Sequence, residues 1–370
     1  MTIFNNIFFG KKVLITGNTG FKGSWLTIWL LKLGAEIIGI SKDVPSSPSM
    51  FCELELESKI HHHFEDITNK TAIKNIILDQ KPDFIFHLAA QAIVSESYEN
   101  PFDTLNSNIM GTGSILDALK NYENDCIAIL ITSDKCYDNL EWPWGYKETD
   151  KLGGKDIYSG SKGAAELVIN SYFHSFLKDK KNIKIGIGRA GNVIGGGDWA
   201  KDRIIVDCIK SWSQNKPVEI RSPLSTRPWQ HVLEPLSGYL TLAQNIFISD
   251  HLDGSAYNFG PKSEQNRTVL GLLKDLSIFW NFDDPKNAYK VTQNIPFHEA
   301  GLLKLNCDKA LLDLKWEPNL NYHETVNFVG SWYQEHLRKQ THLYDFTENQ
   351  IQEYEAIAQN RSRIWINGKE

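Results

Sequence analysis

Two short groups of residues in this chain have the types and spacing of catalytic machinery. The first is the YxxxK pair Tyr158 and Lys162, whose spacing puts both side chains on one face of a helix. A nearby ammonium group favours the ionised form of a phenol and lowers its pKa from about 10. We therefore expect Tyr158 to serve as a base near neutral pH. The alternative is a surface helix pair, because YxxxK often occurs by chance.

The second group is Ser133, Asp134 and Lys135, which directly follow an apolar run ending at Thr132. Ligands of doubly wound sheets bind beyond the carboxyl ends of the strands. These side chains are therefore expected to face the same cleft as Tyr158. The alternative is that Asp134 and Lys135 form an ordinary turn or ion pair.

A glycine triplet points to a dinucleotide. Gly17, Gly20 and Gly23 follow the strand-like run at 12–16 and precede an apolar helical stretch. A Cβ atom would block both the tight turn and the approach of a pyrophosphate to the helix N-terminus. The alternative is a tight turn without a ligand. The end of the next strand lacks the usual ribose-binding acid and carries Lys42 instead, which leaves NADP open or marks a solvated surface charge.

The elements that must position these residues alternate between strands and helices. Apolar runs predict strands at 12–16, 35–41, 84–88, 127–132 and 183–189, and helices at 25–33, 69–80, 108–122 and 158–178. This alternation predicts an α/β doubly wound parallel sheet of the Rossmann type over residues 1–190. Residues 191–370 are expected to form a smaller C-terminal substrate domain, with parts of 231–260 returning to the sheet.

Composition narrows the function classes. The 370 residues include 41% hydrophobic residues and carry a net charge of -6, which disfavours nucleic-acid binding. The five cysteines are odd in number and form no CxxC pair, which fits a reducing cytoplasm. We expect no signal peptide, no membrane span and no metal site. Residues His61–His63 cannot all face one ion and are expected to form a solvated turn.

Several longer motifs carry a family resemblance. They are GNTGFKGSWL (17–26), FHLAAQ (86–91), TSDKCYDN (132–139), EWPWGY (141–146), YSGSKGAAELV (158–168), RAGNVIGGGDWAKDR (189–203), RPWQHVLEPLSGYL (227–240) and HEAGLLKL (298–305). Together they resemble the CDP-glucose 4,6-dehydratase family of the extended short-chain dehydrogenase/reductases, from about residue 8 to about residue 335. The lysine of Ser-Asp-Lys is the most specific feature, because related dTDP-glucose and GDP-mannose enzymes carry Thr-Asp-Glu or Ser-Glu-type triplets.

The resemblance implies a lyase that uses NAD to convert CDP-D-glucose to CDP-4-keto-6-deoxy-D-glucose. Such enzymes serve deoxysugar or dideoxysugar biosynthesis for O-antigen or other surface polysaccharides, including lipopolysaccharide. By position, Ser133 would bind the sugar 4-hydroxyl, Tyr158 would remove its proton, Asp134 would protonate the departing hydroxyl at carbon 6, and Lys135 or a nearby water would take the proton from carbon 5. Lys135 must then lose its own proton, and Asp134 must keep its proton, so both need desolvation.

The resemblance also assigns the binding residues. The expected NAD contacts are Gly17, Asn18, Gly20, Phe21, Lys22, Gly23, Asp66, Ile67, Leu88, Ala89, Ala90 and Gln91, with Tyr158 and Lys162. The expected nucleotide-sugar contacts are Asn192, Arg203, Arg221 and Arg227. Asn108 is expected to be structural, while Trp229 and His231 are equally suited to the core and to a ligand site. NAD is favoured over NADP because the hydride returns to the substrate in each cycle.

Three positions depart from the family pattern, and two rival functions stay open. Asn18 replaces a frequent histidine, Ser95 a usual arginine, and Ser41–Pro48 an apolar-proline run.

The first rival function is that of another dehydratase, an epimerase or a reductase acting on a different nucleotide sugar. The second is a non-catalytic NAD-binding protein. Family resemblance further suggests a homodimer or homotetramer built on a bundle of two helices per subunit.

Overall fold

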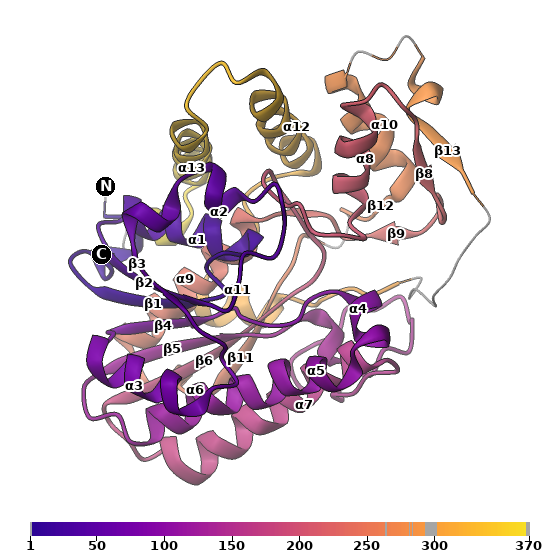
Figure 1. Cartoon of the computed structure of the whole chain (residues 1–370). Helices are drawn as coiled ribbons and strands as arrows, with labels where there is room; N and C mark the ends of the chain where they lie inside the picture. Colours follow the sequence, from indigo (N-terminus) through magenta and orange to yellow (C-terminus); the bar gives the residue numbers. More distant parts are fainter. Residues whose placement is uncertain (1, 263–264, 281, 283, 293–301, 368–370) are drawn as a thin grey trace.

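The protein is built on a sheet of seven parallel strands. The computed structural model describes residues 2–262, 265–280, 282, 284–292 and 302–367. The strands lie in the order β11-β6-β5-β4-β1-β2-β3 (Figure 1). Their bounds are β1 Lys12–Thr16, β2 Glu36–Ser41, β3 His61–Phe64, β4 Phe84–His87, β5 Cys126–Ile131, β6 Ile183–Ala190 and β11 Ser255–Phe259.

Helices cover both faces of this sheet. One face, lined by residues such as Leu14 and Ile85, packs against α3 (Lys70–Gln80), α6 (Gly111–Lys120) and α7 (Ile157–Tyr172). The other face, lined by residues such as Ile15 and Phe86, packs against α1 (Phe21–Lys32) and α9 (Leu233–Ile248). Figure 1 shows the two helical layers on either side of the strands. Because both faces are buried, the inner strands contain nearly continuous apolar runs.

The five predicted strands are confirmed to within one residue at each end, but the sequence reasoning missed β3. The expectation that His61–His63 form a solvated turn is wrong, because these residues pair in parallel with Ile38–Ile40 at the sheet edge. A strand at the edge of a sheet is held by backbone hydrogen bonds to one neighbour and does not need apolar side chains. The three histidines therefore gave no apolar pattern from which a strand could be predicted. The predicted helices at 108–122 and 158–178 contain the π-helical turns η3 (Asn106–Met110) and η5 (Phe173–Leu177).

The second half of the chain is divided between the sheet and a separate lobe. Helix α9 and strand β11 return to the sheet, where β11 pairs with β6. The lobe at the upper right of Figure 1 contains α8 (Ile204–Trp212), β8 (Val218–Ile220), β9 (Thr226–Arg227), β12 (Arg267–Thr268), α10 (Val269–Ser277) and β13 (Tyr289–Val291). Among the described residues, three small two-stranded sheets accompany them: β8 with β13, β9 with β12, and β7 (Val193–Ile194) with β10 (Gln230–His231).

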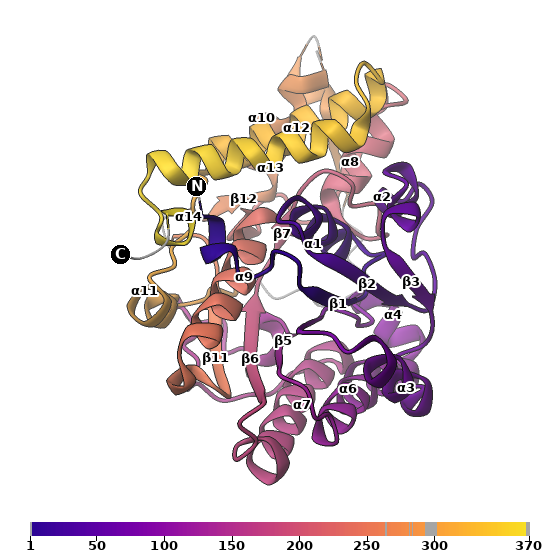
Figure 2. The ribbon, with the colours of Figure 1, turned by 90° about the vertical axis from the view of Figure 1, so that its left-hand side faces the viewer.

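The C-terminal helices pack onto the first helix of the sheet domain. Trp29 donates from Nε1 to Glu355 on α13 at 2.9 Å, and Lys32 bonds to the same carboxylate at 2.6 Å. Figure 2 shows α13 lying alongside α12. The helices of this region are α11 (Asp308–Leu314), α12 (Tyr322–Arg338), α13 (Leu343–Asn360) and α14 (Ile364–Asn367).

Shorter elements complete the fold. They are α2 (Met50–Glu53), α4 (Val94–Glu99), α5 (Pro101–Leu105) and the 3-10 turns η1 (Ile3–Asn6), η2 (Leu56–Lys59), η4 (Asp134–Cys136), η6 (Asp250–Leu252), η7 (Ile278–Trp280) and η8 (Pro285–Ala288). Within the described ranges, no helix combines the length and apolar character needed to cross a membrane.

The packing of α1 against the turn after β1 gives a first prediction. A Cβ atom on Gly23 would lie 2.1 Å from the carbonyl oxygen of Gly17. Because backbone cannot yield as a flexible side chain does, Gly23→Ala should lower the free energy of unfolding by about 1–3 kcal/mol. Urea denaturation measures this change.

The matched control is Gly113→Ala in α6, where a Cβ atom would meet nothing within 4 Å. Alanine should stabilise this helix by about 0.5–1 kcal/mol. Equal effects of the two substitutions would contradict the close backbone contact at Gly23.

Candidate active site

The turn between β1 and α1 has the shape of a phosphate-binding loop. Gly17 has a φ of +75°, and a Cβ there would lie 2.8 Å from the backbone nitrogen of Ala89. Gly20 caps α1 with an extended backbone. The turn is thus pressed between the helix and the segment after β4 by direct backbone contact. The free amides at the start of α1 are left to meet an anion.

Asn18 fills the space between this turn and β2. It is fully buried, and its Oδ1 accepts a hydrogen bond from Ser41 at 2.8 Å. Its Nδ2 lies 3.1 Å from Nδ1 of His62, and its amide covers Gly39. Asn18 therefore connects the turn to strands β2 and β3. Lys42, beyond the end of β2, is exposed.

Buried hydrogen bonds fix the other wall of this site. Thr16 Oγ1 accepts from the backbone N–H of Ala89 at 3.1 Å and lies 2.8 Å from Nδ1 of His87. Burial lowers the pKa of His87 to about 3, so its ring is neutral. Asn108 accepts from the Gln91 amide and donates to Ser161 of α7, both at 2.8 Å. The expectation that Asn108 is structural is confirmed.

The other expected contacts on this side follow β3 and β4. Asp66 accepts two hydrogen bonds from Thr68, each of 2.8 Å. Ile67 is buried and lies against Gly111 at the start of α6. Leu88, Ala89 and Ala90 continue from β4, and the Leu88 amide donates to the carbonyl of Thr16.

Helix α7 begins where its cap places Tyr158 in the first turn. Asp156 accepts from the backbone amide and the hydroxyl of Ser159, at 2.9 and 2.6 Å, as an N-cap carboxylate does. Gly154 packs directly on this turn, since a Cβ there would lie 2.3 Å from the nitrogen of Gly160. Tyr158 and Lys162 are each only 7% exposed, so they do not form a surface pair.

The direction expected for the pKa of Tyr158 is wrong. Burial raises this pKa, and that effect exceeds the opposing influence of the Arg203 charge and a hydrogen bond with Ser133. Burial also lowers the pKa of Lys162 to about 8, although Cys136 and Glu166 counteract it. The sequence reasoning considered the neighbouring charge and omitted desolvation, which dominates in the protein interior.

Ser133, Asp134 and Lys135 form the tight turn η4 at the end of β5. The Ser133 hydroxyl donates to Asp134 at 2.9 Å and accepts from the Lys135 amide at 3.3 Å. Asp134 is 3% exposed, while Lys135 is partly buried. Both lie within the described part of the chain, and no ion pair joins them there. The ion-pair alternative is therefore not what this structure contains.

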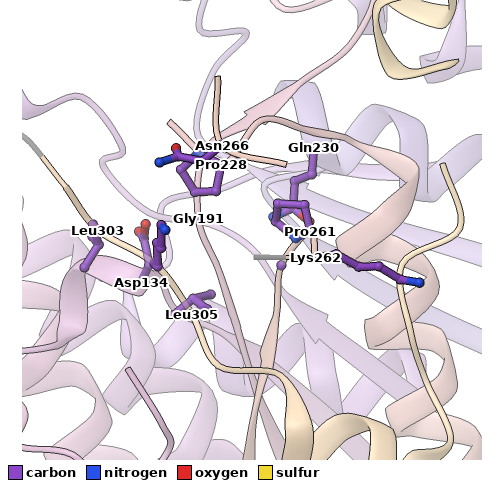
Figure 3. A pocket seen from close by; sticks show the side chains of 11 residues that line it. Asp134, Gly191, Pro228, Gln230, Pro261, Lys262, Asn266, Leu303 and Leu305 are labelled. Carbon is purple, nitrogen blue, oxygen red and sulfur yellow. The ribbon is translucent and has the colours of Figure 1, made fainter. Parts of the chain in front are cut away.

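Asp134 lines a pocket formed by distant parts of the chain (Figure 3). Its carboxylate points at Gly191, where a Cβ would lie 2.8 Å from Oδ2. Leu303, Lys304 and Leu305 form another side, held by a 2.9 Å bond from the Tyr146 amide to the Lys304 carbonyl. The HEAGLLKL motif was the only sequence signal for this segment, and its residues 298–301 lie outside the described residues.

Lys22, in the first turn of α1, lies near several charged residues from other parts of the chain. Burial lowers its pKa to about 8, while Asp134 and Asp198 raise it and Arg203 and Lys162 lower it further. Each of these four charged groups therefore lies close enough to Lys22 to affect its pKa. Phe21, beside Lys22, packs against Gly195 of the second half of the chain.

The expected substrate residues lie at different depths. Arg203 precedes α8, donates to the Ala92 carbonyl at 3.4 Å and influences Tyr158. Asn192 follows β6 and is partly buried. Arg221 is exposed and lies near Asp207 of α8. Arg227, on β9, donates to the Thr226 carbonyl at 3.0 Å.

The two residues whose role was left open belong to the core. Trp229 is 4% exposed and donates to the Arg267 carbonyl. His231 is fully buried between the rings of Trp25 and Phe328. Sequence reasoning also missed the buried pair Glu166 and Arg189 beneath η4.

Comparisons with known proteins show the family to which this chain belongs. The family model for GDP-mannose 4,6 dehydratase matches residues 14–329. CDP-glucose 4,6-dehydratase of Salmonella typhimurium is 44% identical over 340 residues, which cover 91% of this chain and 94% of that protein. CDP-paratose 2-epimerase of Salmonella typhi is 26% identical and covers 87% of this chain and 98% of that protein.

Solved structures show the same fold. DesIV, a dTDP-glucose 4,6-dehydratase from Streptomyces venezuelae crystallised with NAD and TYD, superposes with a TM-score of 0.75 at 18% identity. The match covers 90% of this chain and 99% of that one. With a family model over residues 14–329 and a 44% identical relative along nearly its whole length, this chain belongs to the GDP-mannose 4,6-dehydratase family of nucleotide-sugar enzymes.

Proposed function

We propose that this protein is an NAD-dependent hydro-lyase that converts CDP-D-glucose to CDP-4-keto-6-deoxy-D-glucose. The observation that carries the proposal is the buried Asp134, which accepts a hydrogen bond from Ser133 and, like Ser133, influences the pKa of Tyr158. The 44% identity to a CDP-glucose 4,6-dehydratase supports the choice of substrate. Ser-Asp-Lys at this strand end is the triplet expected of the cytidylyl enzymes.

The turn after β1 fits a dinucleotide. The contacts at Gly17 and Gly23 leave no room for a Cβ, so the backbone itself can approach a pyrophosphate. Gly20, Lys22 and the segment Leu88–Gln91 would complete the site. NAD, when bound, supplies a holder for the hydride taken from carbon 4 until it is delivered to carbon 6. We favour NAD over NADP because this cycle involves no net oxidation.

The oxidation step is assigned to α7 and Ser133. Tyr158 would remove the proton of the sugar 4-hydroxyl, with Ser133 holding that hydroxyl in place. Lys162, one turn further along the helix, would stabilise the tyrosinate. Because burial raises the pKa of Tyr158, the phenol needs this cation close by in order to ionise.

The elimination step is assigned to η4. A ketone at carbon 4 makes the proton on carbon 5 acidic, and Lys135 or a water beside it would remove that proton. Asp134 would give a proton to the hydroxyl that leaves carbon 6. A carboxyl group that is 3% exposed is well placed to deliver a proton without exchange with bulk water.

We further propose that residues 1–190 mainly bind the cofactor and 191–370 mainly the nucleotide sugar. Asn192, Arg203, Arg221 and Arg227 are the candidates for the pyrophosphate. Arginine suits this role because its planar fork donates two hydrogen bonds to phosphate oxygens.

A second candidate function is epimerisation, since a CDP-paratose 2-epimerase is 26% identical. An epimerase that inverts carbon 2 needs no acid at carbon 6. The buried Asp134 therefore favours the dehydratase. A non-catalytic NAD-binding protein would have no need for the complete set of Tyr158, Lys162 and Asp134.

The cellular setting is also part of the proposal. The five cysteines are all free, which suits a reducing cytoplasm. We place the reaction in deoxysugar synthesis for lipopolysaccharide or another surface polysaccharide. A homodimer or homotetramer is supported by exposed apolar side chains on the layer of α5, η3 and α7: Phe102 is 80%, Met110 60% and Leu167 58% exposed.

The first prediction here tests which substrate reacts and how many turnovers each NAD supports. Purified protein with CDP-glucose should form a 4-keto sugar, seen by its absorbance in alkali, through many turnovers for each NAD. The hydride returns within each cycle, so little NADH should accumulate.

The same assay tests the nucleotide preference. CDP-glucose should react far faster than its dTDP, UDP or GDP analogues. Stoichiometric release of NADH would exclude a dehydratase, and equal use of dTDP-glucose would exclude the cytidylyl preference alone.

The second prediction separates oxidation from elimination. Asp134→Asn should slow product formation by roughly 10²–10⁴-fold, the usual contribution of a general acid. It should still let enzyme-bound NADH form in a single turnover. Tyr158→Phe should abolish both signals, because oxidation comes first. Near-normal turnover of Asp134→Asn would show that Asp134 is not the general acid.

The third prediction concerns assembly. The double substitution Met110→Glu with Leu167→Glu adds charge to the proposed interface and should reduce the mass in light scattering to that of a monomer. Leu224→Glu is the control, because Leu224 is 78% exposed but lies in the other lobe. An unchanged mass in the double variant would refute this interface.

A further inference from the structure

A buried ion pair lies beneath the catalytic turn. Arg189 on β6 holds Glu166 on α7 with two hydrogen bonds, of 2.7 Å from Nε and 2.5 Å from Nη2. Their side chains are only 4% and 0% exposed. This two-pronged geometry is the strongest and most directional form of an arginine–carboxylate contact.

The pair is bonded to both ends of the turn. The Thr132 hydroxyl, directly before Ser133, donates to Glu166 at 2.6 Å. The Tyr137 hydroxyl, at the far end, accepts from Arg189 at 2.7 Å and donates to Asn258 at 2.8 Å. The ion pair thus holds both Thr132 and Tyr137. Residues 133–136, which lie between them, are fixed at both ends.

Stability alone does not account for this arrangement. Desolvation of two charges offsets most of their attraction, and buried ion pairs can often be replaced by apolar side chains without loss of stability. A well-packed apolar pair would also fill this part of the core. It would not hold the hydroxyls of Thr132 and Tyr137, so what the charges add is a fixed geometry for the turn.

The start of α7 is fixed by different contacts. Asp156 caps the first turn and Gly154 packs against it, so Tyr158 is held by contacts of its own in addition to the ion pair further along the helix. Lys162 lies on the same helix, one turn before Glu166. Tyr158, the base proposed for oxidation, therefore has anchors outside the turn η4, whereas Ser133 moves with that turn.

We propose that Glu166 and Arg189 are positioning residues for the elimination step, acting through Thr132 and Tyr137 to hold Asp134 and Lys135 against the substrate. This inference rests on the proposed function. A shift of the turn by about 1 Å is enough to cost up to about 100-fold in rate. The same shift would slow the first hydride transfer less, because Tyr158 has anchors of its own and only the contact of Ser133 with the 4-hydroxyl would move.

The test uses variants that each remove one hydroxyl and leave the ion pair intact. Tyr137→Phe and Thr132→Val should each slow product formation by about 10- to 100-fold in single turnovers with CDP-glucose and NAD. Formation of bound NADH and the KM for CDP-glucose should change less than about threefold. Exchange of the carbon 5 proton with deuterated solvent should slow along with product formation.

Matched controls remove equally buried hydroxyls elsewhere. Tyr122→Phe loses one bond to the Pro82 carbonyl, and Thr241→Val loses one to the Ser237 carbonyl. Both should leave the ratio of the two rates at the wild-type value even if thermal stability falls. A drop of both steps by one factor in Tyr137→Phe and Thr132→Val, or no drop at all, would overturn the proposal. Absence of product with the unaltered enzyme would instead reject the proposed function.

Discussion

All chemistry in this protein depends on one constraint: seven strands run in the same direction, so their carboxyl ends share one edge. The turn after β1, the segment after β4 and the turn η4 after β5 all emerge there. Burial on both faces makes this register rigid, because a slip of one residue would turn apolar side chains from one core toward the other. Groups far apart in sequence, such as Gly17 and Asp134, are thereby brought to one edge of the sheet without any long-range motif.

The parts that sequence reasoning predicted well are those where one physical requirement dominates. The strands β1, β4, β5 and β6 must be apolar, and the glycines of the first turn must lack a Cβ, so each leaves a readable pattern. Strand β3 left none, because an edge strand such as His61–Phe64 needs only backbone pairing. The role of Trp229 and His231 could not be decided from the sequence, since a buried ring and a ligand-binding ring have the same residue type.

Burial also explains why electrostatic reasoning from sequence failed at Tyr158. A spacing of four residues gives the neighbour of a group but not its depth in the protein. Desolvation raises the pKa of Tyr158 and lowers those of Lys162 and Lys22. Each shift moves its group toward the neutral form, and an anionic ligand beside the two lysines would oppose it by favouring their charged forms.

The division of roles that we propose for the two halves of the chain follows from the same reasoning. The sheet domain supplies groups whose positions cannot vary, because backbone contacts such as that of Gly23 with Gly17 allow no adjustment. The walls of the pocket at Asp134 come instead from loops around Pro228, Pro261 and Leu303, which carry no strong periodicity. Loops on a rigid scaffold tolerate change. Under the proposed function, these loops could vary with the nucleotide sugar, while the turn after β1 and the turn η4 keep their positions.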